Sequence, residues 1–259
     1  MKYGARKLIK AVAPYGVVVF WRKYKLSIKN SKLNYCPVCE KWSEFIPAVN
    51  GMGMAREKGV CINCGTLERH RLTWLFIIRK VGLDSIKKKS MLHVAAEQVL
   101  EHNFRKIVGK KYLTADYLLK ADVKMDITDI KFKDNSFDII MCNHVLEHVS
   151  DDVKAMKEMY RVMKPAGWAI FLVPIADKEI TYENSKVKTD EGRLKHFGQI
   201  DHVRKYGTDY VGRLESAGWK VRVYKAREIA SNKEIKQMVL TEDEKNFGFT
   251  PTEIFYCTK

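Results

Sequence analysis

Four of the six cysteines form two closely spaced pairs, and this pattern constrains the fold more than any other feature of the chain. The spacing is C-x2-C-x21-C-x2-C, with cysteines at Cys36, Cys39, Cys61 and Cys64. Two thiolates with two residues between them can reach one metal ion, and a second such pair completes the closed four-thiolate site of a structural zinc ribbon. Two unrelated pairs, or two redox C-x-x-C motifs, are the alternatives. Cys142 and Cys257 lie in apolar runs and are expected to be buried thiols.

The composition is that of a globular chain. The chain has 259 residues, of which 46% are hydrophobic and 11% aromatic. A chain of this length can bury a full core, which excludes a wholly disordered protein and a small disulfide-bonded scaffold. We expect an arm at 1–30, the ribbon at 31–70 and one main domain at 71–259.

The net charge of +16 is concentrated at the N-terminal end, where residues 1–39 contain nine lysines or arginines and no acidic residue before Glu40. The longest uncharged stretch there, 11–21, would be about 16 Å long as a helix, against about 30 Å for the hydrocarbon layer, so it cannot span a membrane. No signal-peptide cleavage pattern follows it, which predicts a cytoplasmic protein. Its apolar and basic residues predict a peripheral contact of 1–30 with an anionic membrane surface, while packing on the ribbon or on a second subunit is the alternative.

Short apolar runs alternate with helical patterns in the rest of the chain. Strands are predicted at 90–95, 111–115, 137–142, 167–175, 219–224 and 254–257. Helices are predicted at 66–82 with Thr66 as N-cap, at 150–163 with Ser150 as N-cap, and at 208–217. Strands and helices in alternation indicate an α/β fold with a doubly wound, mostly parallel sheet.

Ligands of such sheets bind outside the carboxyl ends of the strands, so the residues at those ends are the candidate site. Glu97 follows the first strand, and Asp116 ends the second strand 19 residues later, where a carboxylate can accept hydrogen bonds from both hydroxyls of a ribose. An acidic residue that caps a surface turn is the alternative for Asp116. Asn143 and His144 end the strand predicted at 137–142.

Four motifs between residues 90 and 175 resemble the class I S-adenosylmethionine-dependent methyltransferases of the small methyltransferase-domain type. They are DIT at 126–128, NSFDII at 135–140, HVLEHV at 144–149 and EMYRVMKPAG at 158–167. The resemblance implies a Rossmann-like, seven-stranded sheet whose last strand, near 254–257, is antiparallel. It also implies that Asp116 binds the ribose, that Asp126 and the Ile127 backbone bind the adenine, and that Asn143 lies by the methionyl part of the cofactor.

The sequence departs from this family in the first loop. Where the family has a glycine-rich loop, this chain has HVAAEQV at 93–99. The cofactor has no pyrophosphate, so the loop needs only a small residue where the backbone approaches the ligand. We expect Ala95 to take that place and Glu97 to accept the ammonium group of the cofactor. A descendant of the fold that has lost the cofactor is the alternative.

A long polar segment at 176–207 is expected to cover the methyl group as a substrate lid. Its candidate substrate-binding residues are His196, Arg204 and Tyr206. Arginine can bind an anionic acceptor through two hydrogen bonds, and histidine can take the proton of a hydroxyl. His144 and His202 are the candidate catalytic bases, whereas His148 is expected to be structural. A solvated loop without function is the alternative for this segment.

These features predict methyl transfer to a hydroxyl or other polar group of a glycan or small molecule, including an acceptor that is lipid-linked at the membrane surface. S-adenosylmethionine is the expected cofactor and zinc the expected structural metal. The basic arm, the ribbon and the FGQIDHVRKYG stretch at 197–207 resemble methyltransferases of surface-polysaccharide pathways. A ribosomal or transfer RNA methyltransferase is the runner-up, because a zinc ribbon before a class I domain also resembles the rRNA guanine methyltransferases. Nucleic acid is the less favoured partner, since the basic charge lies in the arm. A degenerate binding module is the third candidate.

Overall fold

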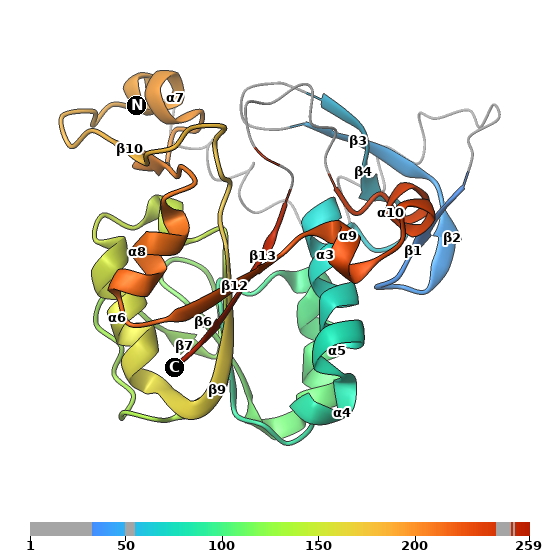
Figure 1. The fold of residues 1–259 in the computed structure, drawn as a ribbon, viewed down its shortest axis with the longest axis horizontal. Coiled ribbons are helices and arrows are strands. Elements are labelled where there is room, and N and C mark those ends of the chain that lie inside the picture. Colours follow the sequence, from blue (N-terminus) through green and yellow to red (C-terminus); the bar gives the residue numbers. More distant parts are fainter. Residues whose placement is uncertain (1–32, 50–54, 242–249, 251) are drawn as a thin grey trace.

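The computed structural model describes residues 33–49, 55–241, 250 and 252–259 (Figure 1). The arm predicted at 1–30 lies outside the described residues. The core is a seven-stranded sheet with strand order β12-β13-β9-β8-β5-β6-β7. The strands are β5 (Met91–Val94), β6 (Tyr112–Asp116), β7 (Val123–Lys124), β8 (Phe137–Asn143), β9 (Met163–Leu172), β12 (Lys220–Tyr224) and β13 (Ile254–Thr258).

Strand β13 is antiparallel to both of its neighbours, with Cys257 paired with Ala169 of β9 and with Val221 of β12. Strands β5, β6, β7, β8 and β9 are parallel, and Met91 of β5 pairs with Tyr112 and Ile139 on its two sides. The predicted Rossmann-like, seven-stranded and mostly parallel sheet with an antiparallel last strand is therefore confirmed. The central strands β5 and β8 are almost entirely buried, which explains why they read as unbroken apolar runs.

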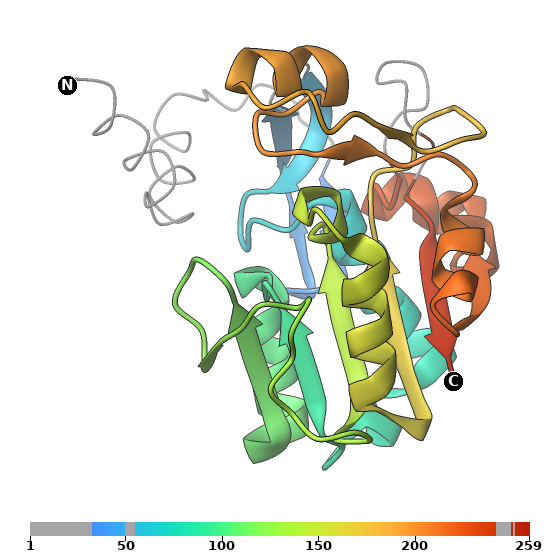
Figure 2. The same cartoon turned by 90° about the vertical axis from the view of Figure 1, so that its left-hand side faces the viewer.

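Helices cover both faces of the sheet, as Figures 1 and 2 show. On one face lie α3 (Glu68–Phe76), continued by the π-helical turn η1 (Ile77–Val81), then α4 (Leu83–Ile86) and α5 (Gln98–Val108). On the other lie α6 (Asp152–Val162) and α8 (Tyr210–Ser216). Helix α5 buries Leu100, Phe104 and Val108, which are spaced one helical turn apart and face the sheet. The remaining short helices are η2 (Gly109–Lys111), η3 (Leu146–His148), α9 (Ala226–Ile229) and α10 (Asn232–Met238).

Two additions lie at the carboxyl edge of the sheet (Figure 1). The first is the predicted ribbon, made of hairpins β1–β2 (Asn34–Cys36, Lys41–Ser43) and β3–β4 (Phe45–Val49, Ala55–Cys61). The second, between β9 and α8, contains β10 (Tyr182–Glu183), α7 (Asp190–Phe197) and β11 (Arg204–Lys205). We call this second addition the insertion. Buried ribbon residues such as Cys36 and Phe45 share one apolar core with the main domain.

Two predicted helix caps are wrong. Helix α3 has Leu67 at its N-cap position, and the Thr66 hydroxyl lies 3.3 Å from the sulfurs of Cys36 and Cys64 instead. Helix α6 is capped by Asp151, whose carboxylate accepts a hydrogen bond from the Lys154 N–H, not by Ser150. Within the described residues no helix is both long enough and apolar enough to cross a membrane.

Candidate functional site

The turn after β5 replaces a glycine-rich loop with a strained alanine. Ala95 has φ +46°, in the left-handed region that residues with a side chain rarely adopt, and its N–H donates to the Ala115 carbonyl at 2.7 Å. The Cβ atom of alanine makes this backbone conformation unfavourable. Such a conformation persists only where the surrounding structure enforces it. Glu97 then occupies the N-cap position of α5.

Glu97 is held by two neighbours from different strands. Its Oε2 lies 2.6 Å from His93 Nε2, and its Oε1 accepts a 3.1 Å hydrogen bond from Asn143 Nδ2. The other ring nitrogen of His93 lies 2.7 Å from the Tyr112 hydroxyl. Burial opposes ionisation of Glu97, but the hydrogen bond and charge of His93 outweigh it and lower its pKa to about 2. A fixed carboxylate therefore lies at the carboxyl ends of β5 and β8.

Asn143 leaves one polar atom available beside this carboxylate. Its side chain is buried, and its Oδ1 has no hydrogen-bond partner among the described residues. A buried carbonyl oxygen without a partner is unfavourable, so the position calls for a donor from a ligand. The carboxylate of Glu97 and the amide oxygen of Asn143 together fit an ammonium group, as the amino-acid part of S-adenosylmethionine would require.

Asp116 ends β6 at the same edge of the sheet. Its Oδ1 accepts hydrogen bonds of 2.7 Å from the N–H groups of Leu118 and Leu119. Both leucines are exposed, by 85% and 65%, which leaves apolar surface beside the carboxylate that a flat apolar ligand could cover. The Oδ1 atom therefore shapes the turn.

Asp126 and Ile127 follow β7. Asp126 Oδ1 accepts hydrogen bonds from the Thr128 N–H and hydroxyl, both at 2.8 Å, and these lower the pKa of this carboxyl. The Ile127 side chain is buried. The motif at 126–128 is thus a turn closed by the Asp126 side chain, directly after β7.

A group of histidines surrounds Glu147 beyond the end of β8. His144 has φ +53° and its Nδ1 lies 3.2 Å from Glu147 Oε1. Burial opposes ionisation of Glu147, but the His144 hydrogen bond holds the pKa of this carboxyl below its ordinary value. The ring of His148 packs edge-on against the ring of His202, with centroids 4.7 Å apart. Burial lowers the pKa of His202 to about 4, so this imidazole is neutral near pH 7.

The insertion has a hollow of about 630 Å³ on its own surface. The hollow is lined by Ala176, Lys178, Glu179, Ile180, Tyr182, His196 and Lys205. His196 Nδ1 lies 2.7 Å from the Tyr182 hydroxyl, and the two rings stack. The structure therefore places His196 among the residues that line a hollow.

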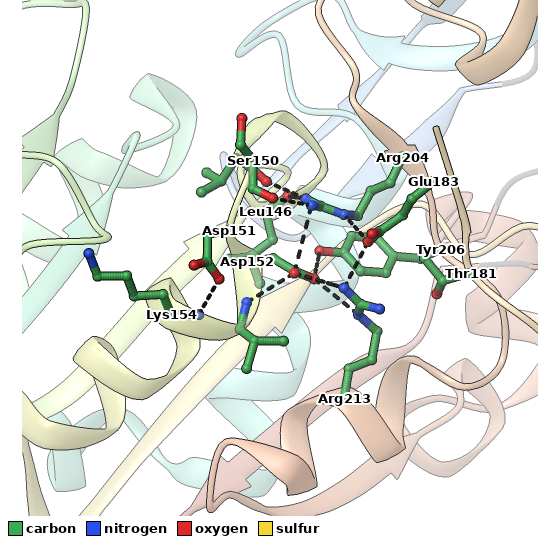
Figure 3. A network of polar contacts seen from close by, with 12 residues as sticks. Leu146, Ser150, Asp151, Asp152, Lys154, Thr181, Glu183, Arg204, Tyr206 and Arg213 are labelled. Carbon is green, nitrogen blue, oxygen red and sulfur yellow. Dashed lines mark hydrogen bonds and ion pairs between the residues drawn. The ribbon is translucent and has the colours of Figure 1, made fainter. Parts of the chain in front are cut away.

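Arg204 and Tyr206 are buried in the polar network shown in Figure 3. The guanidinium of Arg204 donates to the carbonyls of Leu146 (2.6 Å), Val149 and Ser150 (2.9 Å), and to Glu183 Oε1 at 2.7 Å. The Tyr206 hydroxyl donates to Asp152 Oδ2 at 2.7 Å. The donors that the sequence analysis expected to bind substrate are thus hydrogen-bonded within the chain.

The network in Figure 3 fixes the insertion to the main domain. Asp152 at the start of α6 also receives two hydrogen bonds from Arg213 Nη2, at 2.8 and 3.0 Å, and Arg213 reaches Glu183 of β10 at 2.8 Å. Each charge is paired, as buried charges need to be. The insertion therefore covers the carboxyl edge in a defined position.

The four ribbon cysteines come together as the sequence predicted. Their sulfurs lie within 4.8 Å of one another, with 3.6 Å between Cys36 and Cys64 and 3.9 Å between Cys39 and Cys61. Tetrahedral bonds of about 2.3 Å to one zinc ion would set the sulfurs about 3.8 Å apart. The cluster can therefore hold a metal ion of this kind with little movement.

Two buried residues of α3, His70 and Arg71, were given no role in the sequence analysis. Arg71 of α3 is fully buried and donates to the carbonyls of Thr66 (2.6 Å) and Gly59 (3.1 Å) in the ribbon and of Val239 (2.7 Å) beyond α10. His70 is buried, its Nε2 has no partner among the described residues, and it lies within electrostatic range of Glu97 and His144. Burial holds the pKa of His70 well below its ordinary value.

His93 is the most important residue that the sequence analysis missed. It lies in a strand that reads as a buried apolar run, where a histidine is easily taken for a core residue. The available signal was the spacing: His93 precedes Glu97 by four residues, and Tyr112 lies on the neighbouring strand. A buried histidine needs hydrogen-bond partners, and Glu97 and Tyr112 are at the right positions to supply them.

The segment that carries Glu97, Asp116 and Asn143 is similar to known proteins. Residues 81–171 match the family model described as a methyltransferase domain. An uncharacterized protein of Methanocaldococcus jannaschii is 41% identical over 87 residues, which are 32% of this chain and 38% of that protein. A ubiquinone/menaquinone biosynthesis C-methyltransferase of Pseudoalteromonas translucida is 39% identical over 83 residues, which are 32% of this chain and 28% of that enzyme.

Among solved structures, a SAM-dependent methyltransferase from Archaeoglobus fulgidus is similar over 75% of this chain and 95% of its own, with 12% identity and a TM-score of 0.47. The chain spans less than two fifths of the length of the two curated relatives.

Proposed function

We propose that this protein is an S-adenosylmethionine-dependent methyltransferase with a polar acceptor. The observation that carries the proposal is the pair of Glu97 and Asn143, a fixed carboxylate and an unpaired buried amide oxygen at the carboxyl ends of β5 and β8. Both lie in the segment that matches the methyltransferase-domain model. Asp116 stands at the end of the next strand, β6, as a carboxylate for a ribose would.

In this proposal, three groups of residues bind the three parts of the cofactor. Ala95, Glu97 and Asn143 hold the amino-acid part of the cofactor, Asp116 holds the ribose, and Asp126 with the Ile127 backbone holds the adenine. The cofactor supplies an activated methyl group, so the leaving thioether needs no acid. The protein has to align the acceptor and to accept its proton as the new bond to carbon forms.

His144 and His202 are the proposed proton acceptors. His144 is part of the turn that follows β8, and its partner Glu147 can stabilise the imidazolium that proton transfer creates. His202 is neutral near pH 7 and has an unprotonated ring nitrogen, but burial lowers its pKa to about 4, which makes it a weak base. His144 follows Asn143 directly and faces Glu147, and His202 lies within 4.8 Å of the same Glu147 carboxylate.

The proposed acceptor is a hydroxyl of a glycan or a small molecule, held by the insertion. The hollow lined by Tyr182, His196 and Lys205 offers hydrogen-bond donors and positive charge for such a molecule. The Pseudoalteromonas relative is named for a C-methylation in quinone biosynthesis, but its alignment of 83 residues is no longer than the matched domain and does not decide the acceptor. Zinc is proposed for the cysteine cluster, in a structural role.

The test has two stages. Calorimetry with S-adenosylmethionine and with its demethylated product should show binding of both, and absence of binding at millimolar concentration would contradict the proposal. Radiolabelled cofactor is then incubated with separate lipid, polysaccharide and RNA fractions of a lysate. Label in the polysaccharide fraction supports a glycan acceptor, whereas label in RNA supports the runner-up and label in quinone lipids supports C-methylation. Binding without transfer to any fraction supports the degenerate module.

A further inference from the structure

Three residues outside the cysteine cluster present metal-binding atoms to one another. Glu147 and His148 come from η3, and His202 comes from the insertion just before β11. One ligand atom of each lies within 4.8 Å of those of the other two. Two imidazoles and one carboxylate form the donor set that divalent first-row transition metals favour.

Glu147 supplies an independent sign of a missing ligand. Its side chain is 2% exposed, and its Oε2 is buried without a hydrogen-bond partner among the described residues. Its other oxygen, Oε1, faces His144 Nδ1 at 3.2 Å. A buried, unpaired carboxylate oxygen is costly, and a cation is the ligand that best removes that cost.

His148 has the hydrogen bond that prepares a histidine for metal binding. Its Nδ1 lies 3.2 Å from the Asp201 carbonyl oxygen, so Nδ1 carries the proton and donates. The lone pair is then on Nε2, and a backbone carbonyl at the opposite ring nitrogen is the usual support of a metal-bound histidine.

The two segments that carry these residues are already fastened together. The Val203 N–H donates to the Glu147 carbonyl at 2.9 Å, and Arg204 donates to the Leu146 carbonyl at 2.6 Å. His202, 4% exposed, is next to Val203 and is therefore held against η3. The ligands are brought together by backbone contacts that need no metal.

We propose that Glu147, His148 and His202 bind one divalent transition-metal cation of the zinc, cobalt or manganese class. Bonds of about 2.1 Å would set the ligand atoms about 3.0–3.4 Å apart, so small side-chain rotations close the site. Three ligands leave open positions for water or an oxygen ligand. With the ion bound, His202 acts as a ligand and His144 remains the proposed base. This metal site does not depend on the proposed methyl transfer.

The experiment counts metal equivalents in the untagged full-length protein. After equilibrium dialysis against Co²⁺, we expect two bound equivalents, one with sulfur-to-cobalt charge-transfer absorption and one without. His148→Gln and Glu147→Gln should each lose the second equivalent and keep the first. Cys61→Ser should lose the first and keep the second. His102→Gln, a change in an exposed histidine of α5, should keep both.

One equivalent in the unaltered protein, or two in both His148→Gln and Glu147→Gln, would overturn the proposal. Circular dichroism shows whether each variant is folded. His148 is 32% exposed, so His148→Gln remains a fair test should Glu147→Gln fail to fold. Cofactor calorimetry on the same samples tests the proposed methyl transfer separately, because a folded protein can lose the second equivalent and still bind S-adenosylmethionine.

Discussion

His93 Nε2 and Glu97 Oε2 lie 2.6 Å apart, and this contact joins the buried strand β5 to the first turn of α5. It holds a carboxylate in place where the resembling enzymes have a glycine-rich loop. The orientation of the Glu97 side chain is thus set by His93, a residue within the sheet.

Glu97→Gln should change how stability depends on pH. The pKa of Glu97 falls from 4.5 to about 2 on folding, so the carboxylate stabilises the folded protein above about pH 4.5, and this contribution is lost as the pH falls toward 2. The free energy of unfolding should fall more steeply for the unaltered protein than for the variant, by at most about 3 kcal/mol over this range. Urea unfolding at several pH values measures it, and a gap that is independent of pH would contradict it.

Asp116→Asn should weaken binding of S-adenosylmethionine at least about tenfold. The amide keeps an Oδ1 acceptor for the Leu118 and Leu119 N–H groups, so the turn is preserved, while the charge that strengthens hydrogen bonds to ribose hydroxyls is lost. Calorimetry measures the affinity. Asp129→Asn, which changes an exposed aspartate paired with Lys131, is the matched control and should bind normally. Equal affinities would remove Asp116 from the proposed site.

The sheet could be predicted because each strand has a recognisable local sequence pattern. Strands such as β8 are buried on both faces and therefore appear as continuous apolar runs between turn residues. The cysteine cluster could be predicted because its spacing is local as well. The role of Arg204 could not be predicted, because a polar residue in a long polar segment is expected to face solvent. Its partners, the carbonyls of Leu146 and Ser150, lie more than 50 residues away in the sequence. Thr66 was misjudged for the same reason: its partners are cysteines 30 and two residues away.

Cys61→Ser should remove one zinc equivalent and lower the thermal stability. Four thiolates leave no open position on the metal, so the ion contributes to folding and not to catalysis. Metal analysis and thermal unfolding measure the two effects. Cys142→Ala changes a buried thiol of β8 outside the cluster, so it should keep its zinc. Full zinc content and stability in Cys61→Ser would contradict the four-thiolate site.

Deletion of residues 1–30 should leave a folded protein that no longer sediments with anionic vesicles. Eight lysines or arginines in this segment can each gain about 1 kcal/mol near anionic lipid. Replacement of Arg22, Lys23 and Lys25 by glutamine should therefore weaken vesicle binding by about 3 kcal/mol, or about a hundredfold. Neutral vesicles provide the control. A truncated protein that unfolds would instead indicate that the arm packs on protein.

Arg204→Met should lower the free energy of unfolding by about 3–5 kcal/mol, the usual cost of removing one partner from a buried ion pair, which here is Arg204 with Asp152. The methionine fills part of the space but leaves the carbonyls of Leu146 and Ser150 without their hydrogen-bond donor. Glu183 loses one of its two arginine partners and keeps only its ion pair with Arg213. The insertion should also become easier to cleave by trypsin, because the network in Figure 3 holds it against η3 and α6. Arg222→Met, which removes an exposed arginine of β12, should change stability little. If Arg204→Met is as stable as this control but has lost methyl transfer, then Arg204 contacts the acceptor, and the substrate-binding role expected from the sequence is restored.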